Sequence, residues 1–365
     1  MKIGSAGVHE RVESPIGAGI VIQRSGPMIN IGICGFGYWG PNLLRNFATN
    51  PGFCPVAVAE RRETYRTNAA TLAPNLRLYE EAADLIDDPE IEAVAIATPV
   101  SNHFELARRA LARFKHVLVE KPMCASVAEG EELVALAERT RRTLMVNHTY
   151  LFHGAVQKLR ELKSSGELGV VSYFDSVRIN LGLFQPDMNV LWDLAPHDFS
   201  IMNYLFDEEP IQLEATGYCH LNPHLPDIAY ITMHFPSRMI AHFHLSWMSP
   251  VKVRRIAVGG TNQMAVWDDL NQDEKLKLYD SGIEIHPEDE RRTLVPSYRI
   301  GDVLSPRIRD DEPLAAVVEH FRRVIASEEA SLLSGQHGLQ IVRLLEQTQI
   351  ALDASLAKLN CGREA

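Results

Sequence analysis

The spacing of apolar residues divides this chain into two parts. Up to about residue 146, short apolar runs of strand length alternate with longer segments in which apolar residues recur at helical spacing. The expected strands are 29–34, 56–59, 93–97, 116–119 and 143–146, and the expected helices are 41–47, 64–72, 101–114 and 126–140. This alternation predicts an α/β domain with a doubly wound parallel sheet. Ligands bind such a sheet outside the carboxyl ends of its strands, so the residues there carry the candidate chemistry.

The second part begins with a helix at 153–163 and continues as a succession of strands. We expect strands at 170–179, 211–218, 228–235, 239–247, 253–258 and 263–267, an inserted helix at 194–206, and final helices at 314–326 and 337–357. This order predicts an α+β domain with an open, largely antiparallel sheet. The chain is thus expected to divide into an extension (1–27), a first domain (28–148) and a second domain (149–365). Because Met28 directly precedes the first strand, we expect no function of the extension; an ordered arm around 16–22 is the alternative.

A glycine-rich turn, Gly35-Phe36-Gly37-Tyr38-Trp39-Gly40, joins the first strand to the first helix. The first glycine permits the tight turn, the second lets the backbone approach a pyrophosphate, and the third lets helix and strand pack closely. The free N–H groups at the helix start attract an anion. Glu60 ends the next strand at the spacing of the dinucleotide fingerprint. Together these features predict a Rossmann domain, with a glycine turn of another α/β domain as the alternative.

Glu60 also bears on the choice of cofactor. Its carboxylate would accept hydrogen bonds from the ribose hydroxyls and would repel a 2′-phosphate, which favours NAD over NADP. Arg61 and Arg62 follow directly and offer either stacking on adenine or a partner for that phosphate.

Polar residues follow three later strands of the first part, as Thr98-Pro99, Glu120-Lys121-Pro122 and Asn147-His148. Asn102 and Glu105 have capping-box spacing, so we expect Asn102 to cap the next helix. His103 is either a solvated helix residue or a ligand contact. Lys121 stands where the nicotinamide end of a cofactor should reach, and a surface lysine is the alternative.

The inserted helix of the second part carries Trp192-Asp193-Leu194-Ala195-Pro196-His197-Asp198. Proline fits best in the first turn of a helix, so we expect the helix to begin at about Asp193, with Asp193 as N-cap and Asp198 as a first-turn charge. His197 lies one turn after Asp193, on the same face.

The order of glycine turn, Thr-Pro, Glu-Lys-Pro and Asp-x-x-x-His resembles the Gfo/Idh/MocA family of nicotinamide-dependent dehydrogenases, over nearly the whole chain from Met28. The resemblance implies the same two-domain layout, with the open sheet serving for substrate binding and for subunit contact in a homodimer or homotetramer. It implies that Lys121 is catalytic and that Asp193 and His197 face the nicotinamide beside it. The residues expected to bind the cofactor are Gly35, Phe36, Gly37, Tyr38, Trp39, Gly40, Glu60, Arg61, Thr98, Pro99, Asn102, His103, Glu120, Lys121 and Trp192.

The expected reaction is the reversible oxidation of an alcohol, in which carbon gives a hydride to the cofactor and the hydroxyl loses a proton. His197, with an ordinary pKa of about 6.5, is assigned as the base. Lys121, at about 10.4, is assigned as the electrostatic partner of the developing alkoxide. The reverse assignment stays open.

The segment Arg178-Ile179-Asn180-Leu181-Gly182, with the later Trp-Asp motif, is similar to family members that act on nucleotide-linked sugars, such as UDP-N-acetylhexosamine or its uronate oxidised at C3. Arg178 could pair with a carboxylate or phosphate. The expected substrate-binding residues are Lys121, Tyr150, Arg178, Asn180, Asp193 and His197. The alternatives are a free sugar or inositol dehydrogenase and a non-catalytic NAD-sensing regulator.

Composition narrows the range of partners. The formal net charge of −11 argues against nucleic acid, and no apolar run has membrane-spanning length. The five cysteines are odd in number and scattered, which predicts no disulfide framework and a reduced, cytoplasmic protein. His234, His242 and His244 fall on neighbouring strands without a carboxylate or cysteine at ligand spacing. We therefore expect no metal, and histidines packed in an interface.

Overall fold

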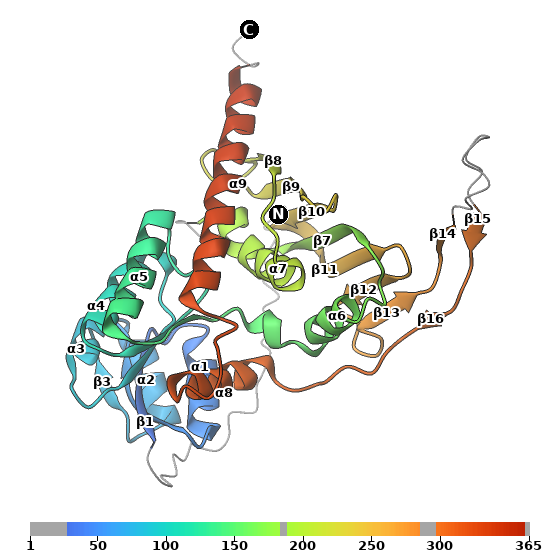
Figure 1. Cartoon of the computed structure of the whole chain (residues 1–365). Helices are drawn as coiled ribbons and strands as arrows, with labels where there is room; N and C mark the ends of the chain where they lie inside the picture. Colours follow the sequence, from blue (N-terminus) through green and yellow to red (C-terminus); the bar gives the residue numbers. More distant parts are fainter. Residues whose placement is uncertain (1–27, 183–187, 285–296, 362–365) are drawn as a thin grey trace, which may run out of the picture.

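The computed structural model describes residues 28–182, 188–284 and 297–361. The expectation for residues 1–27 lies outside the described residues. Within them the chain forms two large sheets that follow one another in sequence, with helices packed around both (Figure 1).

The first sheet has six parallel strands in the order β3-β2-β1-β4-β5-β6. Its strands are β1 (Ile29–Cys34), β2 (Phe53–Ala59), β3 (Arg77–Tyr79), β4 (Ala93–Ile96), β5 (His116–Val119) and β6 (Leu144–Val146). Its helices are α1 (Gly40–Thr49), α2 (Glu63–Leu72), α3 (Ala82–Asp87), α4 (His103–Ala112) and α5 (Val127–Thr140). The predicted doubly wound Rossmann sheet is confirmed. The strand order reverses between β1 and β4, which is where such sheets bind ligands.

The second sheet has eight strands in the order β16-β13-β12-β11-β7-β10-β9-β8. The strands are β7 (Val171–Leu181), β8 (Gln212–Tyr218), β9 (Ile228–His234), β10 (Ile240–Ser246), β11 (Met248–Gly260), β12 (Met264–Asp268), β13 (Leu276–Tyr279) and β16 (Val303–Leu304). Only β7 and β10 pair in parallel, so the predicted, largely antiparallel sheet is confirmed. A separate ribbon of β14 (Gly282–Glu284) and β15 (Ser297–Arg299) extends from it (Figure 1).

Four longer helices and two short turns complete the described structure. They are α6 (Gly154–Ser164), α7 (Val190–Phe206), α8 (Pro313–Ile325), α9 (Gly335–Cys361), and the 3-10 turns η1 (Val100–Asn102) and η2 (Thr149–Phe152). Helix α9 contacts α5 beside the first sheet as well as α7 and β8 of the second part, and α8 packs against α1 (Figure 1). The C-terminal helices therefore bind both halves of the chain together.

Helix α7 begins earlier than expected. Its N-cap is Asn189, whose Oδ1 accepts the N–H groups of Leu191 at 3.0 Å and Trp192 at 3.2 Å. The prediction of Asp193 as N-cap is therefore wrong, and Asp198 is a buried residue in the body of the helix. The helix continues through Pro196, whose ring is buried, with the loss of one backbone hydrogen bond.

The two other expected caps differ in outcome. Ser126 caps α5 as predicted, because its hydroxyl accepts the N–H of Glu129 at 3.3 Å. Asn102 makes no side-chain cap at α4, so that prediction is wrong. The chain enters α4 directly from η1, and the backbone of Asn102 is already helical, whereas a capping residue has an extended conformation.

Candidate active site

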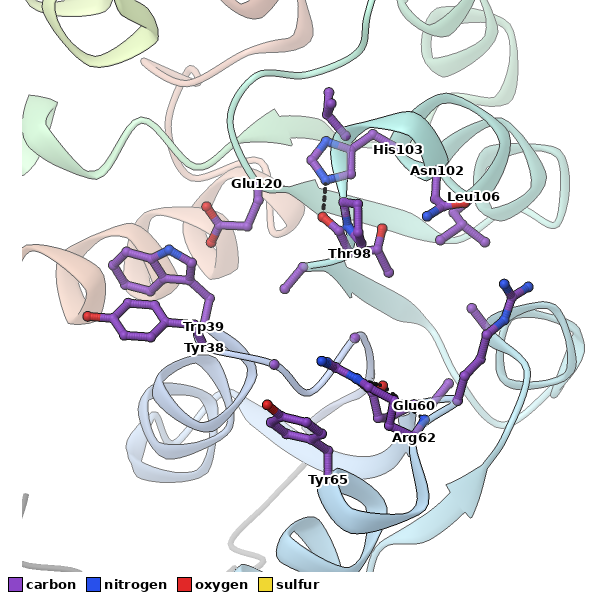
Figure 2. A pocket seen from close by; sticks show the side chains of 18 of the residues that line it. Tyr38, Trp39, Glu60, Arg62, Tyr65, Thr98, Asn102, His103, Leu106 and Glu120 are labelled. Carbon is purple, nitrogen blue, oxygen red and sulfur yellow. Dashed lines mark hydrogen bonds and ion pairs between the residues drawn. The ribbon is translucent and has the colours of Figure 1, made fainter. Parts of the chain in front are cut away.

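A cavity of about 810 Å³ lies at the carboxyl ends of the first sheet's strands (Figure 2). It is walled by the turn before α1, the residues that follow β2, β4 and β5, and part of α7. Of the residues expected to bind the cofactor, those that line it are Gly35, Gly37, Tyr38, Trp39, Glu60, Arg61, Thr98, Pro99, Asn102, His103, Glu120 and Lys121.

The glycine turn shapes one end of this cavity. Gly35 has a φ of +91°, and a Cβ atom there would lie 2.5 Å from the carbonyl oxygen of Ala97. Gly37 instead has open space before it, with only the guanidinium of Arg62 near, at 3.3 Å from a Cβ. Helix α1 starts here without a side-chain cap and without an acidic residue in its first turn, so its N–H groups are free for an anion. These features fit the diphosphate of a dinucleotide.

Two residues of the turn do not line the cavity. The Phe36 side chain is fully buried, and its N–H donates to Glu60 Oε2 at 2.9 Å. Gly40 lies under the turn, where a Cβ would come within 2.7 Å of the Gly35 carbonyl oxygen. Both residues therefore stabilise the turn from the side that faces away from the cavity.

Glu60 is held at the end of β2 by several donors. Arg62 donates to Glu60 Oε1 from Nε at 2.8 Å and from its backbone N–H at 3.1 Å. Burial by itself raises the pKa of Glu60, but these bonds from Arg62 and the one from Phe36 outweigh it and lower the pKa below its usual value. Arg61 pairs with Glu81 at 2.9 Å, and both residues line the cavity. The Arg62 guanidinium lies 3.9 Å from the centre of the Tyr65 ring (Figure 2).

His103 connects two walls of the cavity. It is buried, and its ring nitrogens lie 2.8 Å from the carbonyl oxygens of Thr98 and Pro122. Burial lowers the pKa of His103, although the two carbonyl groups oppose that shift. A neutral imidazole donates from one ring nitrogen at a time, to the carbonyl oxygen of Thr98 (dashed in Figure 2) or to that of Pro122. His103 therefore lies between the residues that follow β4 and the loop that carries Lys121.

A second cavity, of about 570 Å³, adjoins the first. The two share Tyr38, Trp39, Glu120, Lys121 and Asp193 in their walls. All the residues expected to bind substrate line the second cavity, namely Lys121, Tyr150, Arg178, Asn180, Asp193 and His197. The structure therefore brings the predicted reacting groups from both halves of the chain to one place.

Lys121 is positioned by Asp193. Its Nζ donates to the Asp193 carbonyl oxygen at 2.8 Å and to Oδ1 at 3.3 Å. The indole N–H of Trp247 donates to the other carboxylate oxygen of Asp193 at 3.2 Å. Asp193, expected as a cap, thus serves to hold the ammonium group at the boundary of the two cavities.

His197 is a half-buried member of the group. Its Nδ1 atom is buried and has no hydrogen-bond partner among the described residues. Burial, followed by the charges of Lys121, Arg178 and Arg254, lowers the pKa of His197 well below its usual value of 6.5. The imidazole is therefore neutral near neutral pH. Tyr150 packs edge-on against it, with ring centroids 5.0 Å apart.

Arg178 reaches the second cavity but its charge is already compensated. It is buried in a bidentate pair with Asp198, Nε to Oδ2 at 2.8 Å and Nη2 to Oδ1 at 2.7 Å. The guanidinium lies 5.0 Å from the Tyr150 ring, and Arg254 lies 5.5 Å from it. Arg178 and Asp198 have the geometry of a structural ion pair. Arg178 therefore has no free charge for the substrate anion that the sequence predicted as its partner.

Glu120 is the buried carboxyl of the site. It accepts a hydrogen bond from Asn147 Nδ2 at 2.7 Å. Burial raises its pKa to about 7, although Asn147 and Lys121 oppose the shift. Glu120 therefore changes charge near neutral pH, at the wall shared by both cavities.

Trp192 lies outside both cavities. Its indole N–H donates to Gln349 of α9 at 3.1 Å, because the start of α7 turns this side chain toward the C-terminal helix. Sequence reasoning also missed several polar residues of the second cavity, which are His153, Lys252, Arg254 and Asp269. The sequence carried no local signal for Lys252, because the register shift between β7 and β11 decides where it lies.

The described residues contain no group of three or more His, Cys, Asp or Glu side chains placed to hold a metal ion. His242 and His244 instead lie along Tyr230, with ring centroids 6.3 Å and 4.4 Å away. No helix in the described ranges is both long and apolar enough to cross a membrane.

Two family models match the chain. Residues 29–148 match the oxidoreductase family with an NAD-binding Rossmann fold, and residues 156–266 match the GFO/IDH/MocA C-terminal domain. The chain belongs to the Gfo/Idh/MocA family. It is an oxidoreductase of the kind that acts on hydroxyl groups, and NAD is its cofactor.

Among its relatives, UDP-N-acetylglucosamine 3-dehydrogenase of Acidithiobacillus ferrooxidans is 28% identical over 272 residues, which cover 74% of this chain and 81% of that protein. A solved structure with the same name and source has a TM-score of 0.74 at 25% identity, covering 90% of this chain and 99% of that one. Inositol 2-dehydrogenase 2 of Saccharopolyspora erythraea is 28% identical over 191 residues, or 51% of this chain and 56% of that protein.

Proposed function

We propose that this oxidoreductase oxidises a secondary hydroxyl, at C3, of a nucleotide-linked sugar such as UDP-N-acetylhexosamine or its uronate. The observation that carries the proposal is the meeting of Lys121 and His197 in a cavity that continues into the dinucleotide cavity. The name of the Acidithiobacillus relative supports the substrate class.

We assign the cofactor-binding roles to residues that line the first cavity. The free N–H groups of α1 and the open backbone at Gly37 would hold the diphosphate, and Glu60 would hold the adenosine ribose. The lowered pKa keeps Glu60 ionised, which favours NAD over NADP. When bound there, NAD supplies the hydride acceptor.

We assign the proton acceptor among the residues of the second cavity. As hydride leaves the carbinol carbon, the hydroxyl proton passes to the imidazole of His197, which lines the second cavity. Lys121, held by Asp193 as an ion pair at 3.3 Å, stabilises the developing alkoxide. Tyr150 fixes the plane of the His197 ring.

The pH dependence of the reaction tests this assignment. Because burial and neighbouring cations lower the pKa of His197 well below 6.5, its neutral form persists as pH falls through that value. We expect kcat/KM for oxidation to stay nearly flat from about pH 9 to about pH 6 in a Glu120→Gln variant, which removes the carboxyl that titrates near 7. A rate that climbs about tenfold per pH unit over the same range would make the amine of Lys121 the acceptor.

Substrate identity is tested by measuring NAD reduction with UDP-N-acetylglucosamine, its uronate, free N-acetylglucosamine and myo-inositol. We expect the highest kcat/KM with a UDP-sugar and with NAD rather than NADP. A higher value with myo-inositol would favour the alternative, a free cyclitol or sugar dehydrogenase, which the Saccharopolyspora relative supports. Absence of turnover with every polyol, together with tight NAD binding, would leave the non-catalytic regulator.

Three further properties are part of the same proposal. We divide the chain into a cofactor domain at 28–148 and a substrate domain at 149–365, since the first sheet ends at Val146 and the second begins at Val171. We assign a homodimer or homotetramer on the resemblance to the family. Cys34, Cys54, Cys124 and Cys219 are free thiols, which is consistent with a reducing, cytoplasmic location.

A further inference from the structure

This inference rests on the proposed function and concerns how the substrate is recognised. Three of the cationic side chains in the second cavity already have a carboxylate partner. Lys121 pairs with Asp193, Arg178 with Asp198, and Arg254 with Asp269 at 2.6 Å. Lys252 also lines this cavity, and it forms no ion pair within residues 28–182, 188–284 and 297–361. Among the described residues that line the cavity, its ammonium group is therefore the uncompensated positive charge.

A bulge in the second sheet places Lys252 at the cavity mouth. In the pairing of β7 with β11, Met248 faces Leu181 and Val253 faces Ile179, with a shift of register between them. The segment Ser249–Lys252 therefore stands opposite the single residue Asn180, and the strand bends outward there. Lys252 is exposed, whereas the Lys121 side chain is only 15% exposed and His197 is half-buried. The reacting groups thus lie inside the cavity and Lys252 at its entrance, beside Asn180.

We propose that Lys252 binds the anionic group of the substrate, a phosphate or carboxylate oxygen, while the sugar ring lies against Lys121 and His197. An ammonium on a flexible stem is a point-charge ligand for such oxygens. The sequence suggested this role for Arg178. The charge of Arg178 is instead compensated by Asp198 in a buried ion pair. Lys252, in the bulge of the neighbouring strand β11, supplies the positive charge in place of Arg178.

Binding of N-acetylglucosamine 1-phosphate, UDP-N-acetylglucosamine, its uronate and free N-acetylglucosamine to the NADH-loaded protein, measured by calorimetry, tests the proposal. We expect Lys252→Met to weaken binding of the anionic sugars about tenfold relative to free N-acetylglucosamine. Lys252→Arg keeps the charge and should keep most of that affinity. Lys358→Met, which removes an exposed lysine of α9 far from the cavity, is the matched control and should resemble the wild type.

The pattern of losses identifies the anion. Weaker binding of both phosphorylated ligands assigns Lys252 to phosphate, and weaker binding of the uronate alone assigns it to the carboxylate. Equal affinities in Lys252→Met and wild type, or a wild type that binds none of the anionic sugars, would overturn the proposal. Because binding is measured without turnover, a protein that binds anionic sugars through Lys252 but oxidises none would refute only the proposed function.

Discussion

Replacing Lys121 with methionine is expected to lower turnover by about a thousandfold while the affinity for NAD changes little. The ammonium group lies in the wall shared by both cavities and is held there by Asp193 at 2.8 and 3.3 Å. The groups assigned to the diphosphate and ribose, in the glycine turn and at Glu60, are separate from it. Steady-state kcat and the Kd for NAD, measured on the same preparation, check the result.

Lys158→Met serves as control, because Lys158 pairs with Glu161 on α6 and lines neither of the two cavities. It should retain wild-type kinetics. If Lys121→Met lost NAD affinity and turnover in equal measure, or lost its thermal transition, Lys121 would have a structural role and the proposed chemistry would fail.

The second large effect concerns stability. Arg178→Met is expected to lower the free energy of unfolding by about 3–5 kcal/mol, because it leaves the carboxylate of Asp198, only 1% exposed, buried without its partner. Replacing both partners, as Arg178→Met with Asp198→Leu, should restore much of that loss, since an apolar pair removes the isolated charge. Urea unfolding followed by circular dichroism measures both variants.

An exposed pair provides the comparison. Arg108 and Glu105 on α4 are 45% and 64% exposed, and Arg108→Ala should change stability by less than about 1 kcal/mol. A similarly small loss in Arg178→Met would show that water reaches Asp198, and the interpretation of Arg178 and Asp198 as a buried structural ion pair would be wrong.

The sequence allowed the first sheet to be predicted well because its signals are local. The glycine turn, the spacing to Glu60 and the alternation of apolar strands and helices all depend on neighbours along the chain. The short elements β3 and α3 were missed, since three to six residues carry too little periodicity. The start of α7 was misplaced because proline chemistry was weighed without Asn189, whose side chain supplies the cap.

The residues of the candidate site that stand in sequence motifs could be predicted. The residues whose positions depend on ion pairs or on strand pairing could not. Lys121, Asp193 and His197 stand in recognisable motifs, and the structure brings them to one wall. The partner of Arg178 depends on how β7 packs against α7, and the position of Lys252 depends on a shift of register between β7 and β11. Such contacts join residues far apart in sequence, so no local pattern indicates them.

The first turn of α7 is fixed by a residue near the end of the chain. Gln349 Oε1 accepts the side-chain amide of Asn189 at 2.8 Å and the indole N–H of Trp192 at 3.1 Å. During synthesis, the segment that bears Asp193 and His197 leaves the ribosome long before Gln349 does. The nascent polypeptide therefore contains every reacting group well before it can hold them in place, and the site is complete only once helix α9 has been made.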